Sequence, residues 1–239
     1  MRESAFANTF WTMGHVLHLL QDMGVPAHTR NDFASHLMNG MRQPYEYYVK
    51  ANPGLVTGAT VTPSFSNMKL TDFWDTDQYN GSNPSILTNI GLAEFSNANY
   101  FSDYTIPNNG TTLEHTFPYP HLSSSNISGP NYQICTYQLF PGASIKYISR
   151  MNLGPCPADI ASADHFAVMG LLNPSGYPDV NSYAYYWLDE NVNNTYAKEL
   201  LPRAVGYSAE LLNYFFRGTL EVTHVPGGLK VKKIQTRRP

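Results

Sequence analysis

The sequence is poor in charged residues, poor in cysteine and without a long apolar run. Charged side chains make up only 14% of the 239 residues, and the formal net charge at pH 7 is −3. This balance argues against a broad surface for binding nucleic acid. No apolar run approaches the roughly 18 residues that a transmembrane helix needs, so the sequence predicts no membrane-spanning segment. Residues 1–4 do not resemble the start of a signal peptide.

The two cysteines, Cys135 and Cys156, leave two interpretations open. They flank a turn-rich segment with β-strand character, and a disulfide formed in an oxidising compartment would stabilise that segment by about 3 kcal/mol. Two free thiols fit the sequence equally well. A zinc site at these positions is disfavoured, because the cysteines lie far apart and neither has a second cysteine nearby.

Apolar side chains recur at helical spacing through residues 2–23, and a Gly-Val-Pro sequence follows. The periodicity predicts a helix, and the glycine and proline are typical of its end. Within this helix His18 and Asp22 lie four residues apart, so their side chains lie one turn apart on the same face. His15 lies on the same side, one turn earlier. His28 follows just past the predicted end of the helix.

These side chains form a candidate metal site. An imidazole and a carboxylate one turn apart can hold a divalent ion, and His28 can reach the same ion or an adjacent one. Nitrogen and oxygen ligands of this kind suit zinc. A surface ion pair has the same spacing as His18 and Asp22. However, the polar residues interrupt a strongly apolar run, where a buried carboxylate needs a compensating partner.

The pattern His18-x3-Asp22-x5-His28, with a proline two residues before the last histidine, resembles the central motif of the bacterial zinc-dependent phospholipases C. The related zinc-dependent single-strand nucleases carry the motif too. The resemblance is strong over residues 4–50 and weaker over 188–218. It implies a helical bundle around three zinc ions and hydrolysis of a phosphodiester by a zinc-bound water. It also favours a phospholipid head group as substrate and a secreted or periplasmic location.

The resemblance further implies which residues bind zinc. His18 and Asp22 would ligate one ion, with Asp22 as the candidate catalytic carboxylate that bridges two ions, and His28 would ligate a different one. The phospholipases also have a downstream His-x3-Glu pattern. Only its glutamate is present here, as Glu46. The histidine position is Arg42 here, and a guanidinium does not bind metal. His36 is a candidate replacement for that histidine.

Two more residues belong to the predicted site. His15 is a candidate for orienting a ligand carboxylate from outside the metal sphere, and Arg30 is a candidate for contacting a substrate phosphate. The family draws further ligands from earlier segments, whereas residues 1–17 contain no aspartate and no histidine besides His15. We therefore expect the chain to begin inside the family domain. The sequence leaves the number of zinc ions open.

The overall prediction is a mainly α, phospholipase-C-like helical bundle over residues 1–218, with a loop-rich and β-containing insertion at about 102–187. Further helices are predicted from about residue 44, over 83–101 and over 188–217, where Pro202 should kink or divide the last one. Short β-like runs lie at 132–139 and 144–149. Two strands joined by Pro-Gly-Gly predict a hairpin at the start of an appended β segment, residues 219–239.

Two alternative functions are open at this point. The first is a zinc-dependent nuclease or nucleotidase on the same scaffold. The second is a non-catalytic domain that keeps a partial metal site. The substrate cleaved after zinc reconstitution separates the first from a phospholipase, and the metal content separates the second.

Overall fold

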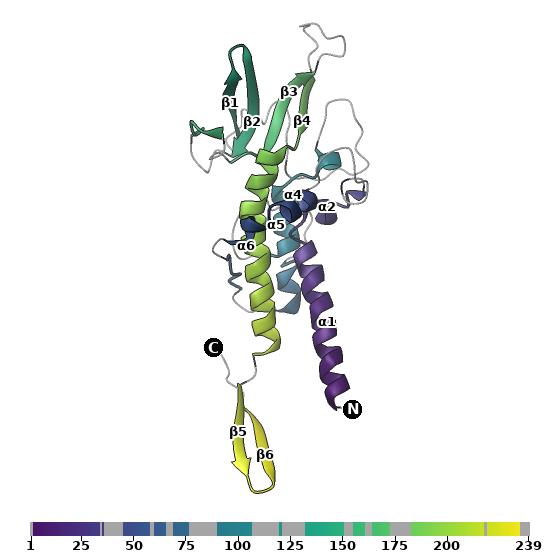
Figure 1. Ribbon diagram of the computed structural model, residues 1–239. Helices are drawn as coiled ribbons and strands as arrows, with labels where there is room; N and C mark the ends of the chain where they lie inside the picture. Colours follow the sequence, from purple (N-terminus) through teal and green to yellow (C-terminus); the bar gives the residue numbers. More distant parts are fainter. Residues whose placement is uncertain are drawn as a thin grey trace.

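Two long helices lie side by side through the molecule, with an antiparallel sheet at one end and a separate hairpin at the other (Figure 1). They are α1, Arg2–Asp22, and α6, Glu190–Phe215. The computed structural model describes residues 2–33, 35, 45–57, 60–65, 69–76, 90–106, 120, 132–150, 155–160, 164–172, 183–217 and 219–234.

Shorter helices lie around the middle of α6, and most of them contact it. They are α2, Pro26–Thr29; α4, Tyr45–Ala51; α5, Leu92–Asn99; and the 3-10 helices η1, Pro53–Thr57, η2, Leu70–Phe73, and η3, Asp103–Thr105. The predicted helices at 2–23, near 44 and over 188–217 are therefore confirmed. The one predicted over 83–101 is described only from residue 90 and is helical over α5. Pro202 does not divide α6, which is one helix from its Asp189 cap onward.

The prediction of a mainly α bundle is wrong. Four antiparallel strands form a sheet in the order β1-β2-β3-β4, which makes the fold mixed α/β. The strands are β1, Tyr132–Phe140; β2, Ala143–Arg150; β3, Ala167–Leu172; and β4, Tyr183–Trp187. The runs predicted at 132–139 and 144–149 correspond to β1 and β2, whereas β3 and β4 double the size of the expected sheet.

The strands β3 and β4 were not predicted because they depend on contacts between strands. Both β3 and β4 are short apolar runs, whose pattern alone does not separate a strand from a buried helical turn. The ring of Trp187 on β4 lies against Gly170 on β3. A Cβ at position 170 would lie only 2.8 Å from Trp187 Cζ3. Such complementarity appears only once the strands are paired.

The core has two parts. The larger part lies between the sheet and the first half of α6 and is rich in aromatic rings, among them Tyr147, Phe166 and Tyr196. The smaller part joins α1 to the second half of α6 through Leu20 and Tyr207. Each fully buried side chain of this size contributes roughly 1.5–3 kcal/mol of transfer free energy. The sheet is thus part of the main core.

The segment 60–65 crosses α6 at very short range. The Val61 N–H donates to the Pro202 carbonyl at 3.0 Å. A Cβ at Gly206 would lie 2.2 Å from the Val61 carbonyl oxygen, a distance that no side chain tolerates. Glycine at position 206 therefore lets this segment lie against the helix backbone.

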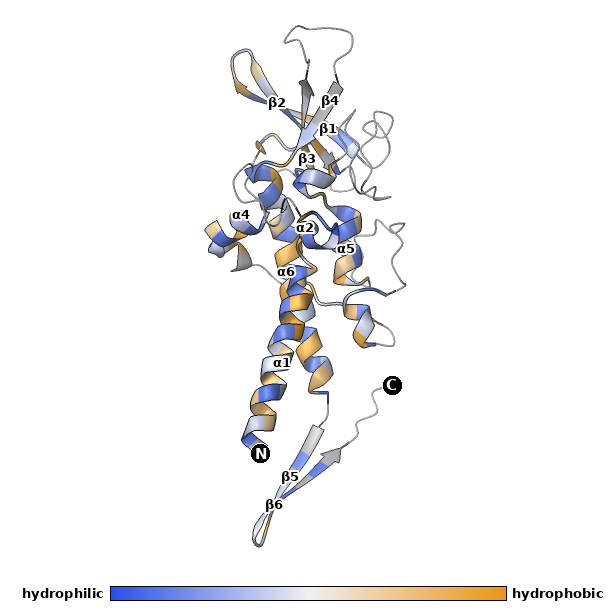
Figure 2. Cartoon of the chain, turned by 90° about the vertical axis from the view of Figure 1, so that its right-hand side faces the viewer, coloured by the Kyte–Doolittle hydropathy of each residue, from blue (hydrophilic) through white to orange (hydrophobic). Residues whose placement is uncertain are grey.

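The N-terminal half of α1 is exposed on all sides, in contrast to α6. Figure 2 shows apolar residues along both helices. On α1 they include Phe6, Phe10 and Trp11, which are 57%, 57% and 69% exposed, and Phe10 stacks on Phe216 after the end of α6. No helix among the described residues is long and apolar enough to cross a membrane.

The C-terminal hairpin is confirmed. Strand β5, Thr219–Val225, pairs with β6, Gly228–Ile234, through a turn in which Gly227 has a φ of 91°. That left-handed conformation favours glycine. The division of the chain at residue 218 into two domains stays a prediction.

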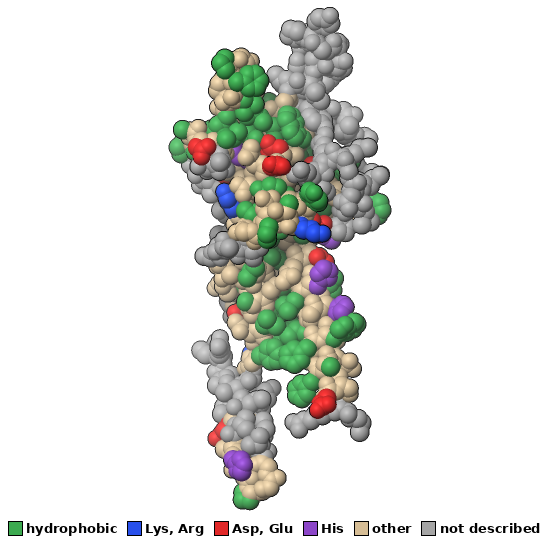
Figure 3. Space-filling model, in the orientation of Figure 1, with side chains coloured by type: hydrophobic (Ala, Val, Ile, Leu, Met, Phe, Trp, Pro, Cys, Tyr) green, Lys and Arg blue, Asp and Glu red, His purple; other side chains and the backbone are tan. Residues whose placement is uncertain are grey.

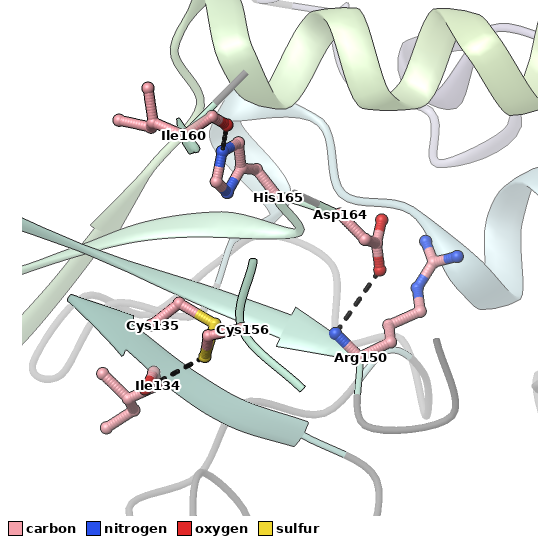
Figure 4. Close-up of a disulfide and its surroundings, with 7 residues drawn as sticks. All are labelled: Ile134, Cys135, Arg150, Cys156, Ile160, Asp164 and His165. Carbon is pink, nitrogen blue, oxygen red and sulfur yellow. Dashed lines mark hydrogen bonds between the residues drawn. A yellow bond between two sulfur atoms is a disulfide. The ribbon is translucent and has the colours of Figure 1, made fainter. Parts of the chain in front are cut away.

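The cysteines form a disulfide, which decides between the two interpretations of the sequence. Cys135 on β1 is bonded to Cys156 across a separation of 21 residues (Figure 4). The bond fixes the segment 155–160 beside the sheet. The carbonyl of Ile160 in that segment also contacts the Nε2 of His165, whose ring stacks on Tyr147.

Candidate metal site

Four of the predicted ligands come together as two pairs around the turn between α1 and α2. On α1, His18 Nε2 lies 3.6 Å from Asp22 Oδ2. Across the turn, His28 Nε2 on α2 lies 3.5 Å from Glu46 Oε1 on α4. The first pair follows from helical spacing, whereas the second needs α2 and α4 to be brought together by the fold.

The sequence between the pairs explains the sharp turn. The Gly24 N–H closes the end of α1 by donating to the Gln21 carbonyl at 2.8 Å. A Cβ at Gly24 would lie 3.1 Å from that carbonyl and 3.4 Å from the Ala204 side chain on α6, so a larger residue would press on both. Pro26 then occupies the first turn of α2, where its missing N–H costs nothing. The turn therefore holds His28 next to the end of α1.

The surroundings of His28 favour its protonated form. The pKa of His28 is raised above 6.5, chiefly by its contact with Glu46. Partial burial acts in the opposite direction, while the charges of Glu46 and Asp22 add to the increase. The contribution of Asp22 is the smallest of these. A zinc ion at His28 has to displace this proton.

A pocket opens beside Glu46. It is lined by apolar and polar side chains, among them Val25, Tyr45, Glu46, Phe101, Asp103 and Leu188. The hydroxyl of Tyr45 is buried and has no hydrogen-bond partner among the described residues. Burial also raises the pKa of Tyr45 far above its usual range, so the phenol stays neutral and can donate a hydrogen bond.

The imidazole nitrogens and carboxylate oxygens of the two pairs are of the types that bind zinc. Each pair supplies two of them. A structural or catalytic zinc uses three or four protein ligands. Within the described ranges, no group of three or more His, Cys, Asp or Glu side chains converges to hold one ion. His36, the candidate replacement ligand, lies outside the described residues, as does Arg42.

The two remaining predicted residues have other contacts. His15 is exposed, its Nδ1 lies 2.9 Å from the Trp11 carbonyl, and its ring lies against the indole of Trp11. Arg30 is only 1% exposed. Its Nε donates to Thr105 Oγ1 at 2.6 Å and its Nη1 to the Asn97 carbonyl at 2.7 Å. These contacts give Arg30 a role in holding α2 against α5, away from the surface.

The sequence pattern did not indicate a buried ionic cluster between the first half of α6 and the sheet. Arg150 Nη1 donates to Glu199 Oε2 at 3.0 Å, and Nη2 donates to the Asn99 carbonyl at 3.0 Å. The Tyr100 hydroxyl contacts the same carboxylate oxygen. Asp164 accepts from the Arg150 N–H (Figure 4), and burial raises the pKa of Asp164 against the effect of the Arg150 charge. The strand β2 alternates polar and apolar residues and contains a second basic side chain, Lys146, so its sequence gave no signal for this cluster.

Comparisons of the chain with protein-family models, with curated proteins and with solved structures found no match.

Proposed function

We propose that the protein is a zinc-dependent phosphodiester hydrolase of the phospholipase C type. The observation that carries the proposal is the contact between His28 and Glu46. These residues belong to different helices, and only the motif resemblance connects them in advance. The proposal rests on the ligand pairs and on the motif, independently of the fold class.

The proposal assigns a role in zinc binding to each candidate ligand. His18 and Asp22 would ligate one zinc ion, and His28 and Glu46 would ligate a different one. A bound zinc would supply a water of lowered pKa and neutralise charge on the phosphoryl group. The substrate phosphoryl group would approach these ligands from the side of the pocket beside Glu46.

The disulfide supports the proposed location. Disulfides persist in secreted and periplasmic proteins and are rare in reducing compartments. The Cys135–Cys156 bond therefore agrees with a secreted or periplasmic protein.

The test is hydrolysis after zinc reconstitution of the full chain. Phosphatidylcholine and single-stranded DNA are offered separately, and the zinc content is measured on the same sample. We expect phosphatidylcholine hydrolysis, its loss in His28→Ala, and unchanged activity in Glu3→Gln, an exposed carboxylate at the start of α1.

Each other outcome selects an alternative. Cleavage of DNA alone would support the nuclease or nucleotidase. At most one zinc per chain, with neither substrate hydrolysed, would support a non-catalytic domain with a partial metal site.

A further inference from the structure

The free end of the β1–β2 hairpin exposes large apolar side chains. Leu139 and Phe140 are 55% and 63% exposed, and Pro141 follows them in the turn. Figure 3 shows hydrophobic side chains gathered over this end of the hairpin, which projects beyond the helices in Figure 1. The strand register shifts between Gln138 and Phe140. Such an irregularity re-aims side chains out of the normal alternation, so neighbouring apolar residues can both lie outside the core.

Two carbonyl groups at this turn accept hydrogen bonds from a side chain of the hairpin. Gln138 Nε2 donates to the Phe140 carbonyl at 2.6 Å and to the Ala143 carbonyl at 3.0 Å. Pro141 has no N–H to satisfy. An apolar medium requires such internal pairing, because a backbone group that loses water without gaining a partner costs several kcal/mol. Two carbonyls of the turn therefore keep a partner when the tip leaves water.

The charged residues of the hairpin indicate which kind of apolar partner it can bind. Residues 132–150 contain no aspartate or glutamate, although the whole chain is negative. The charge of Arg150 is bound to Glu199 at the base of the hairpin, and Lys146 lies between that base and the tip. Lys146 follows Ala143 by three positions, which places it roughly 10 Å from the turn along the strand. This is comparable to the depth of a lipid head-group layer.

From these observations we propose that the tip of the β1–β2 hairpin inserts into a phospholipid surface. Leu139 and Phe140 enter the boundary of the acyl chains, and Lys146 stays at the level of the lipid phosphates. The proposal goes beyond the proposed hydrolysis, because binding to a surface needs neither zinc nor turnover.

The exposed aromatic residues of α1 provide the competing surface. Phe6 and Phe10 are each 57% exposed, close to the exposure of the hairpin pair. They lie on a helix face near Glu3, at the opposite end of the molecule from the hairpin. Replacing them removes a similar apolar area and leaves the hairpin intact, which makes them a matched control.

The experiment is co-sedimentation of the full chain with vesicles, without added zinc. One vesicle is pure phosphatidylcholine and the other contains about 30% phosphatidylglycerol. We expect the wild-type chain to bind both, and Leu139→Ser with Phe140→Ser to bind at least about tenfold more weakly. The variant Phe6→Ser with Phe10→Ser should bind within about twofold of wild type. Lys146→Gln should weaken binding to the anionic vesicle alone.

The opposite results overturn the proposal. The proposal fails if the wild-type chain binds neither vesicle or if the hairpin variant binds as well as wild type. It also fails if the α1 variant loses binding. A second measurement, fluorescence quenching, does not depend on the folding of a serine variant. In Phe140→Trp, bromine-labelled acyl chains should quench the added indole fluorescence, and the absence of added quenching would contradict insertion.

Discussion

Two regions of the molecule hold a carboxylate against a basic side chain, and they do so differently. At the sheet end of α6, Arg150 and Glu199 meet at 3.0 Å, and the Asn99 carbonyl and Tyr100 hydroxyl bind the same two groups. At the turn after α1, the two histidine–carboxylate contacts are 3.6 and 3.5 Å long, beyond a normal hydrogen bond.

The difference indicates two different uses of charge. The first region has short, multiple and directional bonds around a buried guanidinium, as a structural ion pair requires. The second region has longer contacts between groups that can both bind a metal. A cation placed between an imidazole and a carboxylate would replace a weak contact with two strong ones. We therefore expect substitutions in the first region to change stability, and substitutions in the second to change zinc binding.

The largest expected effect is on the buried ion pair. Arg150→Met leaves Glu199 and Asp164 without their cation, and should lower the free energy of unfolding by roughly 3–5 kcal/mol. Chemical denaturation measures the change, with Lys146→Met on the same strand as the control. A loss below about 1 kcal/mol would show that the cluster contributes little to stability.

The disulfide beside the same region gives the next effect. Cys135→Ser with Cys156→Ser opens a loop of 21 residues, which the chain-entropy account values at about 3 kcal/mol. Urea denaturation of the oxidised wild type and the variant measures this loss. Reduction of the wild-type chain should reproduce it, and an unchanged midpoint in both samples would contradict it.

In the second region the effect should appear in metal affinity. Glu46→Gln removes the charge of a proposed ligand while keeping the side-chain shape, so we expect zinc to bind about a hundredfold more weakly. Titration calorimetry measures the affinity, and Glu3→Gln serves as the control carboxylate. Equal zinc affinity in Glu46→Gln and wild type would place the metal elsewhere.

The smallest effect is the pH dependence of the metal-free protein. Because the pKa of His28 is raised in the folded state, its protonated form stabilises the fold fully below the unfolded pKa of about 6.5. This contribution is lost as the pH rises through the folded pKa. Glu46→Gln should therefore be less stable than wild type at about pH 5.5, and the difference should shrink by about pH 8.5. A difference that grows with pH would contradict the assignment.

Local patterns predicted what depends on neighbouring residues along the chain. The helix α1 and the approach of His18 to Asp22 both follow from a period of 3.6 residues. The strands β1 and β2 and the terminal hairpin follow from turns and short apolar runs. The pairing of His28 with Glu46 could be expected only through the motif resemblance.

Contacts between distant segments could not be predicted in this way. Arg150 and Glu199 lie 49 residues apart, on a strand and a helix whose contact no spacing rule describes. Arg30 was expected at a phosphate because it follows the motif closely, yet its side chain lies in the core. The size of the sheet was missed for the same reason, since Gly170 and Trp187 fit each other only in the assembled sheet.

The close approach of Val61 to Gly206 has a consequence for anyone comparing variants of this chain. Position 206 should accept no replacement, even though it lies outside both pairs of candidate ligands. A mutational scan would rank it beside the most sensitive chemical positions. An invariant glycine there would report how tightly one backbone crosses another, and would say nothing about the reaction.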